Sequence, residues 1–324
     1  MRVRGVYERG VAAIPYSVDL WTHYCGFAID QRQDGESVRG LFERGLAYVG
    51  TDWLAHPLWD KYIDFEALSG YGTPAHVAQL YTRVLQVPLK QLPKYWTGFC
   101  EYVSGREAEA VVLEEELRTI TTEVAQDPPP PLAPNPADNG AEEAAAAAAA
   151  AATADAAATL GLGDARLIKF RELRREVYDA AAVAHAAREP FEAGIKRPYF
   201  HVKPLDAAQI ANWERYLTHE ERAGDVPNVV RLYERCVIPC AAHPALWLRY
   251  AAATERYQGP VAARAILQRA TRVFVKRHVE AHLFLARFEE RQVQPPESPP
   301  LRAPPEPPIV FRAPTTSSTQ NPEP

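Results

Sequence analysis

A unit of about 35 residues recurs along this chain, and its recurrence constrains the fold more than any other feature of the sequence. Successive tryptophans are 38 residues apart (21 to 59), then 37 (59 to 96), and later 34 (213 to 247). Within a unit, an arginine follows the tryptophan after 22 to 24 residues. Periods of this size with helical patterning predict an all-α solenoid, because one helix pair cannot bury its apolar face without neighbours.

The clearest unit covers residues 205–237 and predicts two helices joined by a turn. Asp206 begins a helix-start signature, in which a short polar side chain caps free backbone N–H groups. Trp213, Tyr216 and Glu220 follow at i, i+3 and i+7, so a helix places them on one face. A Gly-Asp break then leads to a second apolar run.

The second helix of that unit carries the string Leu232-Tyr233-Glu234-Arg235, and similar strings close the other units. We expect a brace between Glu220 and Arg235, joining the two helices of the unit. Periodic recurrence favours a packing role for the aromatic residues over ligand stacking. The side chains predicted to form the repeated core are Trp21, Tyr24, Trp59, Tyr62, Glu66, Trp96, Trp213, Tyr216, Glu220, Arg235, Trp247 and Tyr250.

The units fall into two blocks, residues 1–126 and residues 164–292. Between them, residues 127–163 contain four consecutive prolines and nine consecutive alanines, which is typical of a disordered low-complexity linker. After them, eleven of the 32 residues in 293–324 are proline, which predicts a disordered tail with polyproline II character.

Two segments depart from the repeat pattern. Ser104 and Glu107 form a capping box that predicts the start of a helix, with apolar residues at helical spacing over 113–124. Residues 195–205 contain two prolines and predict an extended segment, because the residue before a proline avoids the helical region.

The net charge of −5 is unevenly distributed: residues 1–104 carry −1, residues 105–163 carry −9 and residues 164–292 carry +6. A basic second block suggests an anionic partner. Arg269, Arg272 and Lys276 are predicted to share one helix face, where they could contact phosphate or a partner. A solvated helix face is the alternative interpretation.

Catalytic signatures are absent from the sequence. It has no glycine-rich phosphate loop, nucleophile elbow or HExxH motif, so we expect a non-enzyme without a cofactor. His278 and His282 could ligate a metal from one helix face, but they align with repeat positions, so no metal site is expected. The four cysteines are scattered, and no signal peptide or membrane-spanning run is seen, which predicts a soluble intracellular protein with reduced thiols.

With Trp-x2-Tyr on the first helix and Tyr-Glu-Arg on the second, the units resemble half-a-tetratricopeptide (HAT) repeats. Their detailed sequences are similar to those of the pre-mRNA-processing factor 39 family. The strings that carry this resemblance are Tyr7-Glu8-Arg9-Gly10, Trp21-Thr22-His23-Tyr24, Trp59-Asp60-Lys61-Tyr62-Ile63-Asp64-Phe65-Glu66 and, most specifically, Ile195-Lys196-Arg197-Pro198-Tyr199-Phe200-His201-Val202-Lys203-Pro204-Leu205.

This resemblance implies a nuclear, non-catalytic scaffold associated with the U1 small nuclear ribonucleoprotein (snRNP), supporting 5′ splice-site recognition through contacts with other splicing proteins. It also implies pairing through C-terminal repeats, as a homodimer or a heterodimer with a paralogue. The chain begins inside a repeat and its repeats give way to the proline-rich tail, so we expect a form truncated at both ends. The alternatives are a HAT scaffold of mRNA 3′-end or ribosomal RNA processing, and direct RNA binding by the basic second block.

Overall fold

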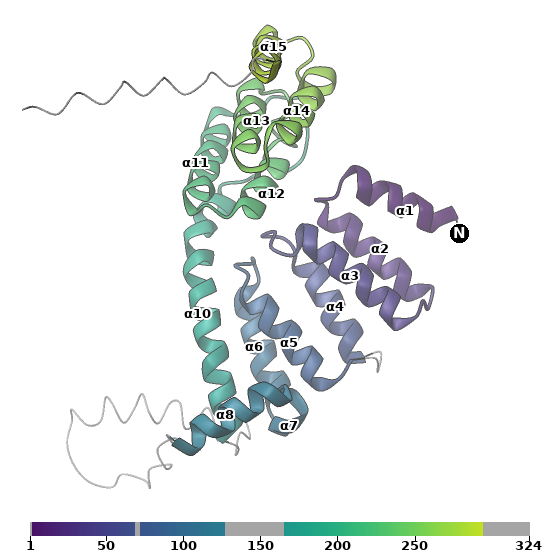
Figure 1. Ribbon diagram of the computed structural model, residues 1–324, viewed down its shortest axis with the longest axis vertical. Helices are drawn as coiled ribbons and strands as arrows, with labels where there is room; N and C mark the ends of the chain where they lie inside the picture. The colour runs from purple at the N-terminus through teal and green to yellow at the C-terminus, as the bar shows by residue number, and fades with distance from the viewer. Residues whose placement is uncertain (1, 69–71, 127–164, 294–324) are drawn as a thin grey trace, which may run out of the picture.

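The computed structural model describes residues 2–68, 72–126 and 165–293, and these residues form helices and no strand (Figure 1). The predicted linker, and the predicted tail beyond its first residue, lie outside them. In chain order the elements are α1 (Arg2–Ala13), α2 (Val18–Asp30), α3 (Gly35–Val49), α4 (His56–Leu68), α5 (Pro74–Leu85), α6 (Leu92–Val103), α7 (Ala108–Val111), α8 (Glu114–Gln126), α10 (Ala165–Ala193), α11 (Ala207–Ala223), α12 (Val226–Cys236), α13 (Pro244–Gln258), α14 (Pro260–Arg269), the π-helical turn η1 (Ala270–Phe274) and α15 (Val279–Val293).

Helix boundaries in the 205–237 unit confirm the sequence prediction. The backbone N–H of Gln209 donates to the carboxylate of Asp206 at 2.8 Å, which caps the start of α11. Gly224 ends the same helix in the left-handed region, with φ +79°, where a residue without a Cβ atom is favoured. Asp225 then caps α12, so the turn between the two helices is only two residues long.

The predicted capping box at Ser104 is wrong. Ser104 ends α6 instead, because both its N–H and its hydroxyl donate to the carbonyl of Cys100, at 3.0 and 2.9 Å. Gly105, with φ +74°, turns the chain away from the helix axis. After the single turn of α7, α8 begins at Glu114 and buries Ile120 against the core, so the helix predicted over 113–124 is present.

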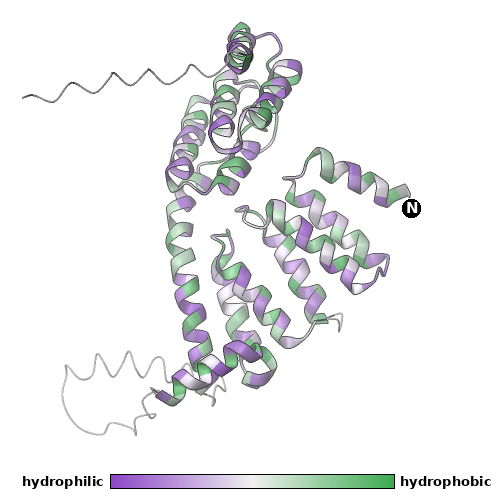
Figure 2. Cartoon of the chain, viewed as in Figure 1, coloured by the Kyte–Doolittle hydropathy of each residue, from purple (hydrophilic) through white to green (hydrophobic). Residues whose placement is uncertain are grey.

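Consecutive helices pair as hairpins, and the hairpins pack side by side into a curved stack (Figure 1). The units are α2 with α3, α4 with α5, α11 with α12, and α13 with α14. Figure 2 shows apolar and polar residues together on the helices, as amphipathic helices with one buried face require. These hairpins form the α-solenoid that the sequence periodicity predicts.

The long helix α10 belongs to both parts of the stack. Leu167, Phe170 and Ala181, in its first two thirds, are buried in the core formed by α1 to α8. Phe191, near its end, packs instead against the core of α11 to α13. The hydrophobic core of the molecule therefore divides inside α10, within the second of the two predicted blocks.

A second contact between the blocks is made by the turn that joins α3 to α4. The Trp53 ring lies 4.8 Å from the ring of His185 in α10. The carboxylate of Asp52 lies 3.6 Å from the guanidinium of Arg235 in α12. Arg231, which is only 9% exposed, donates from its guanidinium to the hydroxyl of Thr51. The two blocks thus pack against each other here as well as along α10.

We expect the two blocks to stay associated when the chain is cut between them. A specific protease site placed within residues 127–164 and then cleaved should give two fragments that co-elute on gel filtration, because α10 fills part of the first core. In a matched chain with Leu167→Asp and Phe170→Asp, the fragments should separate, since burying two carboxylates is unfavourable. Separation of the unsubstituted fragments would contradict the role of α10.

Candidate functional site

Four of the five predicted core tryptophans are buried, each at most 3% exposed: Trp21, Trp59, Trp213 and Trp247. In three of them the indole N–H donates to a carbonyl shortly before the helix, namely that of Pro15 (2.7 Å), Gly50 (2.8 Å) and Ala241 (2.9 Å). The tryptophan therefore packs the hairpin and also ties down the loop that enters it.

Trp96 occupies a different environment from the other four. It is only half-buried, and its ring lies 5.2 Å from that of Tyr178 in α10, with the Arg175 guanidinium 5.2 Å from its centroid. Tyr95, one position earlier, is buried, and its hydroxyl donates to Asp60 at 2.8 Å. Trp96 thus joins α6 to α10, which takes the place of a regular second helix here.

Successive units are joined by stacked aromatic rings. In α2, α4, α11 and α13 a tyrosine stacks on a ring from the helix that closes the preceding unit, with interplanar angles of 9° or less. At α6 the corresponding rings of Tyr81 and Phe99 are tilted by 54°. The stacked pairs and their centroid distances are Tyr7–Tyr24 (4.9 Å), Phe42–Tyr62 (4.6 Å), Phe191–Tyr216 (5.1 Å) and Tyr233–Tyr250 (4.7 Å). Since Phe191 lies in α10, the end of α10 serves as the second helix of a unit.

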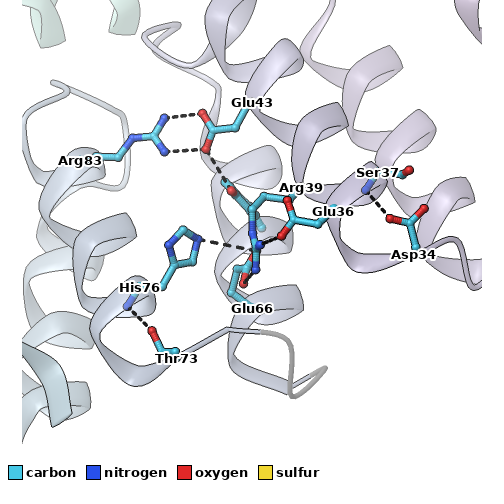
Figure 3. Close-up of polar contacts among 10 residues, drawn as sticks. Asp34, Glu36, Ser37, Arg39, Glu43, Glu66, Thr73, His76 and Arg83 are labelled. Atoms are coloured by element: carbon cyan, nitrogen blue, oxygen red, sulfur yellow. Dashed lines mark hydrogen bonds and ion pairs between the residues drawn. The ribbon is translucent and has the colours of Figure 1, made fainter.

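The glutamate after the stacked ring joins three consecutive helices. In Figure 3, the Glu43 carboxylate of α3 accepts two hydrogen bonds from Arg83 of α5, at 2.6 and 2.8 Å. It also accepts the hydroxyl of Tyr62 in α4 at 2.9 Å. Hydrogen bonds from Arg83 lower the pKa of Glu43 below its ordinary value.

The same three-helix arrangement recurs at two other unit boundaries. Its members there are Glu8 with Tyr24 and Arg44, and Glu234 with Tyr250 and Arg269. The pKa of Glu8 is lowered chiefly by its hydrogen bonds from Arg44. In both cases the glutamate of a Tyr-Glu-Arg string contacts a tyrosine and an arginine of the next unit.

A second series of ion pairs links three first helices, α4, α11 and α15, to the helix before each of them. In each pair the arginine lies three residues before the position that the stacked ring takes on its helix. It donates two hydrogen bonds to a glutamate that lies seven residues after the tryptophan position of the following helix. The pairs are Arg39–Glu66 (2.8 and 2.9 Å, Figure 3), Arg188–Glu220 (2.7 and 2.7 Å) and Arg264–Glu289 (2.7 and 2.8 Å). Glu66 and Glu220 are 1% and 3% exposed, so their charges depend on these partners.

The predicted brace between Glu220 and Arg235 is therefore wrong. Glu220 accepts from Arg188 of α10, while Arg235 donates to Glu192 of α10 at 2.7 and 2.9 Å. Both residues face the preceding unit. Glu220 lies one turn after Tyr216, which stacks on Phe191 of α10, whereas Arg235 lies two positions after Tyr233 and so points away from the ring that stacks on the next unit. Their charges join units to each other and do not brace one hairpin.

The three predicted phosphate-contacting residues do not lie on one regular helix. Arg269 is half-buried, donates to Glu234 at 2.7 Å and lies over the Trp247 ring. Helix α14 ends at Arg269, so Arg272 lies in the π-helical turn and Lys276 lies beyond it. The prediction that they share one helix face is wrong, since the helix changes geometry at their first member.

His282 takes the tryptophan position of the last unit. Its Nε2 atom lies 2.9 Å from the carbonyl oxygen of Lys276, six residues earlier, as the Trp247 indole does from Ala241. Within the residues that the structure describes, no cluster of three or more potential ligands could hold a metal ion. Burial raises the pKa of Cys25 to about 12, which keeps this thiol protonated.

An open groove of about 740 Å³ runs along α11 beside α13, and the sequence did not predict it. Arg215, His219 and Arg222 line it from α11, at the i, i+4 and i+7 positions of one face. Arg249 lines it from α13 and is held by Glu221 at 2.7 Å. Glu214 of α11 also lines the groove, so its lining has three arginines and one glutamate and is positive overall. In the described part of the chain, no helix has the length and apolar character to cross a membrane.

Two family models match this chain. The model described as PRP39 N-terminal HAT repeat matches residues 1–101, and the model described as PRP39 C-terminal HAT repeat matches residues 186–299. The pre-mRNA-processing factor 39 of Schizosaccharomyces pombe is 36% identical over 253 residues, which cover 76% of this chain and 38% of that protein. The chain belongs to the PRP39 family of HAT-repeat proteins.

Other relatives agree with this assignment. The human pre-mRNA-processing factor 39 is 32% identical over 292 residues, covering 89% of this chain and 42% of the human protein. The mRNA 3′-end-processing protein rna14 of S. pombe is 28% identical over only 96 residues, or 26% of this chain. The family and the repeat class predicted from the sequence are confirmed. The chain spans less than half the length of these PRP39 relatives.

Replacing Trp59 by alanine should lower the free energy of unfolding by roughly 3–5 kcal/mol, because a buried indole and its hydrogen bond are both lost. Trp96→Ala is the matched control, and it should cost clearly less, since that ring is half-buried. Urea denaturation followed by circular dichroism measures both. Equal losses for the two variants would contradict the different environments of the two rings.

Removing the buried charge of Glu220 should destabilise the protein by roughly 3 kcal/mol or more, because Arg188 keeps a desolvated charge without a partner. Glu220→Gln tests this in thermal and urea denaturation. Glu36→Gln is the control: the Glu36 side chain is 81% exposed, so its loss should stay within about 0.5 kcal/mol. The double variant Arg188→Met, Glu220→Leu should recover most of the loss. A stable Glu220→Gln variant would show that the pair is dispensable.

Proposed function

We propose that this chain is a non-catalytic scaffold of pre-mRNA splicing that acts in the nucleus. The observation that carries this proposal is the match of both repeat blocks to the PRP39 HAT models, together with relatives named pre-mRNA-processing factor 39. As the finer proposal, the chain associates with the U1 snRNP and supports 5′ splice-site recognition by holding splicing proteins together.

The arrangement of charged residues supports a scaffold over an enzyme. Buried glutamates such as Glu66 and Glu220 are each held by two hydrogen bonds from an arginine of the neighbouring helix. Tyrosine hydroxyls such as that of Tyr62 are engaged in the same contacts. These groups maintain the angle between units, and a curved stack of units offers long surfaces suited to protein partners.

The groove along α11 is the surface that we propose for a protein partner. Its arginines, Arg215 and Arg222, are exposed on the helix. An acidic segment of a splicing protein fits this charge. Pairing into homodimers, or into heterodimers with a paralogue, is a proposal for the longer family proteins, because this chain spans 38% of the S. pombe relative.

A scaffold of mRNA 3′-end processing is the second candidate. The similarity to rna14 favours it, but that similarity covers 26% of this chain, against 76% for the S. pombe PRP39 protein. The difference in coverage gives the splicing role the stronger support.

Affinity purification of the tagged chain from nuclear extract, with sequencing of bound RNAs and identification of bound proteins, tests the proposal. We expect enrichment of U1 RNA and its proteins over the other spliceosomal RNAs. The tag alone and a Trp247→Asp chain, whose second block cannot pack normally, serve as controls. Recovery of a folded chain without U1 RNA would remove the U1 assignment, and enrichment of 3′-end-processing factors would favour the second candidate.

A further inference from the structure

The segment between α10 and α11 exposes large apolar side chains that have no role in the core. Tyr199 is 59% exposed, Phe200 is 58% exposed and Val202 is 89% exposed. The aromatic rings that join the units are buried instead, with Tyr62 and Tyr233 at 0%. Exposed aromatic residues grouped within a few positions make this segment a candidate binding surface.

This segment is held in place although it is not helical. Leu205, at its end, is buried in the second core, and Ile195, at its start, packs against that core. The guanidinium of Arg197 donates to the carbonyl of Lys203 at 3.0 Å, and the Arg197 N–H donates to the side chain of Gln209 at 3.2 Å. These contacts fix both ends, so the exposed rings are presented without a large ordering cost on binding.

The charged residues of the segment itself are all positive. Residues 195–205 contain Lys196, Arg197 and Lys203 and no acidic residue. Lys196 and Lys203 are exposed, and neither has a carboxylate within 4.0 Å among the residues that the structure describes. Asp206, directly after the segment, is engaged in the cap of α11 and lies close enough to Lys196 for the two charges to attract each other.

His201 adds a hydrogen-bond donor to this surface. Its Nδ1 atom accepts the N–H of Lys203 at 2.9 Å, so the neutral ring carries its proton on Nε2. The ring is exposed, which leaves that N–H available to an acceptor on a ligand. The segment therefore offers aromatic faces, two lysines and a donor within a few residues.

We propose that residues 196–203 bind single-stranded RNA, with bases stacked on Tyr199 and Phe200 and phosphates paired with Lys196 and Lys203. Stacking rings interleaved with cations are the means by which proteins bind single strands without strict sequence preference. The absence of acidic residues within the segment and the exposure of both lysines favour a polyanion over an apolar peptide. This inference goes beyond the proposed scaffold function and does not depend on which proteins the scaffold holds.

Fluorescence anisotropy with a labelled ten-nucleotide oligo(U) RNA, titrated with the full chain at several salt concentrations, tests the proposal. Tyr199→Ala with Phe200→Ala should weaken binding about tenfold or more, whereas Tyr199→Phe should retain it, because a ring remains. Since these side chains are exposed, the thermal midpoint of each variant should match that of the parent. An oligo(dT) strand of the same length shows whether the site distinguishes RNA from DNA.

Charge variants separate a defined site from general attraction to a basic protein. Lys196→Ala with Lys203→Ala should weaken binding and reduce the slope of log Kd against log salt by about 1.4, as expected for two lost phosphate contacts. The matched pair Arg272→Ala with Lys276→Ala removes the same charge from the second block and should leave binding nearly unchanged.

Three results would overturn the proposal. The first is equal weakening by the two charge pairs, and the second is unchanged RNA binding by the double aromatic variant. The third is no RNA binding by the parent chain at up to about 100 µM in low salt. If the aromatic variant binds RNA normally but loses a protein from nuclear extract, residues 196–203 form a protein-docking surface instead.

Discussion

The contact between successive units is the interaction on which the rest of this structure depends. A ring from one unit stacks on the first-helix tyrosine of the next, as Phe42 does on Tyr62, and the adjacent Glu43 accepts that tyrosine's hydroxyl. Stacking contributes about 0.5–1.5 kcal/mol beyond apolar burial, whereas burying a large aromatic side chain contributes more than that. Burial therefore supplies most of the energy, and the ring and carboxylate fix the angle at which units meet.

Charged contacts between units contribute little to the stability of the stack. Their main effect is to fix which arrangement of the units forms. Arg39 with Glu66 and Arg188 with Glu220 are buried pairs whose desolvation offsets much of their attraction. Each pair is satisfied only when the two units are in one register, because a guanidinium and a carboxylate pair in a planar, two-bond geometry. Slipping by one turn would leave both charges buried without partners. The pairs thus penalise other arrangements of the same helices.

The spacing of residues on one helix could be predicted from the sequence, but the partners of those residues on other helices could not. Trp213, Tyr216 and Glu220 lie on one buried face as expected, since that follows from helical geometry alone. Which arginine Glu220 meets depends on how α10 runs, and α10 follows a long segment without repeat pattern. The sequence signal that could have shown this is Phe191-Glu192, an aromatic-Glu pair like that of the other unit boundaries.

In the basic second block, residues that join units can be told apart from residues that are available for binding. Arg235 and Arg269 are charged and suited to phosphate, yet both are held by glutamates at unit boundaries. Lysines in the segment before α11 have no such partner, and the aromatic residues between them contribute nothing to the core. Connecting segments are free to carry function because packing does not constrain their outward side chains. In the second block, exposed aromatic residues and lysines are thus available for binding where the repeat pattern is interrupted.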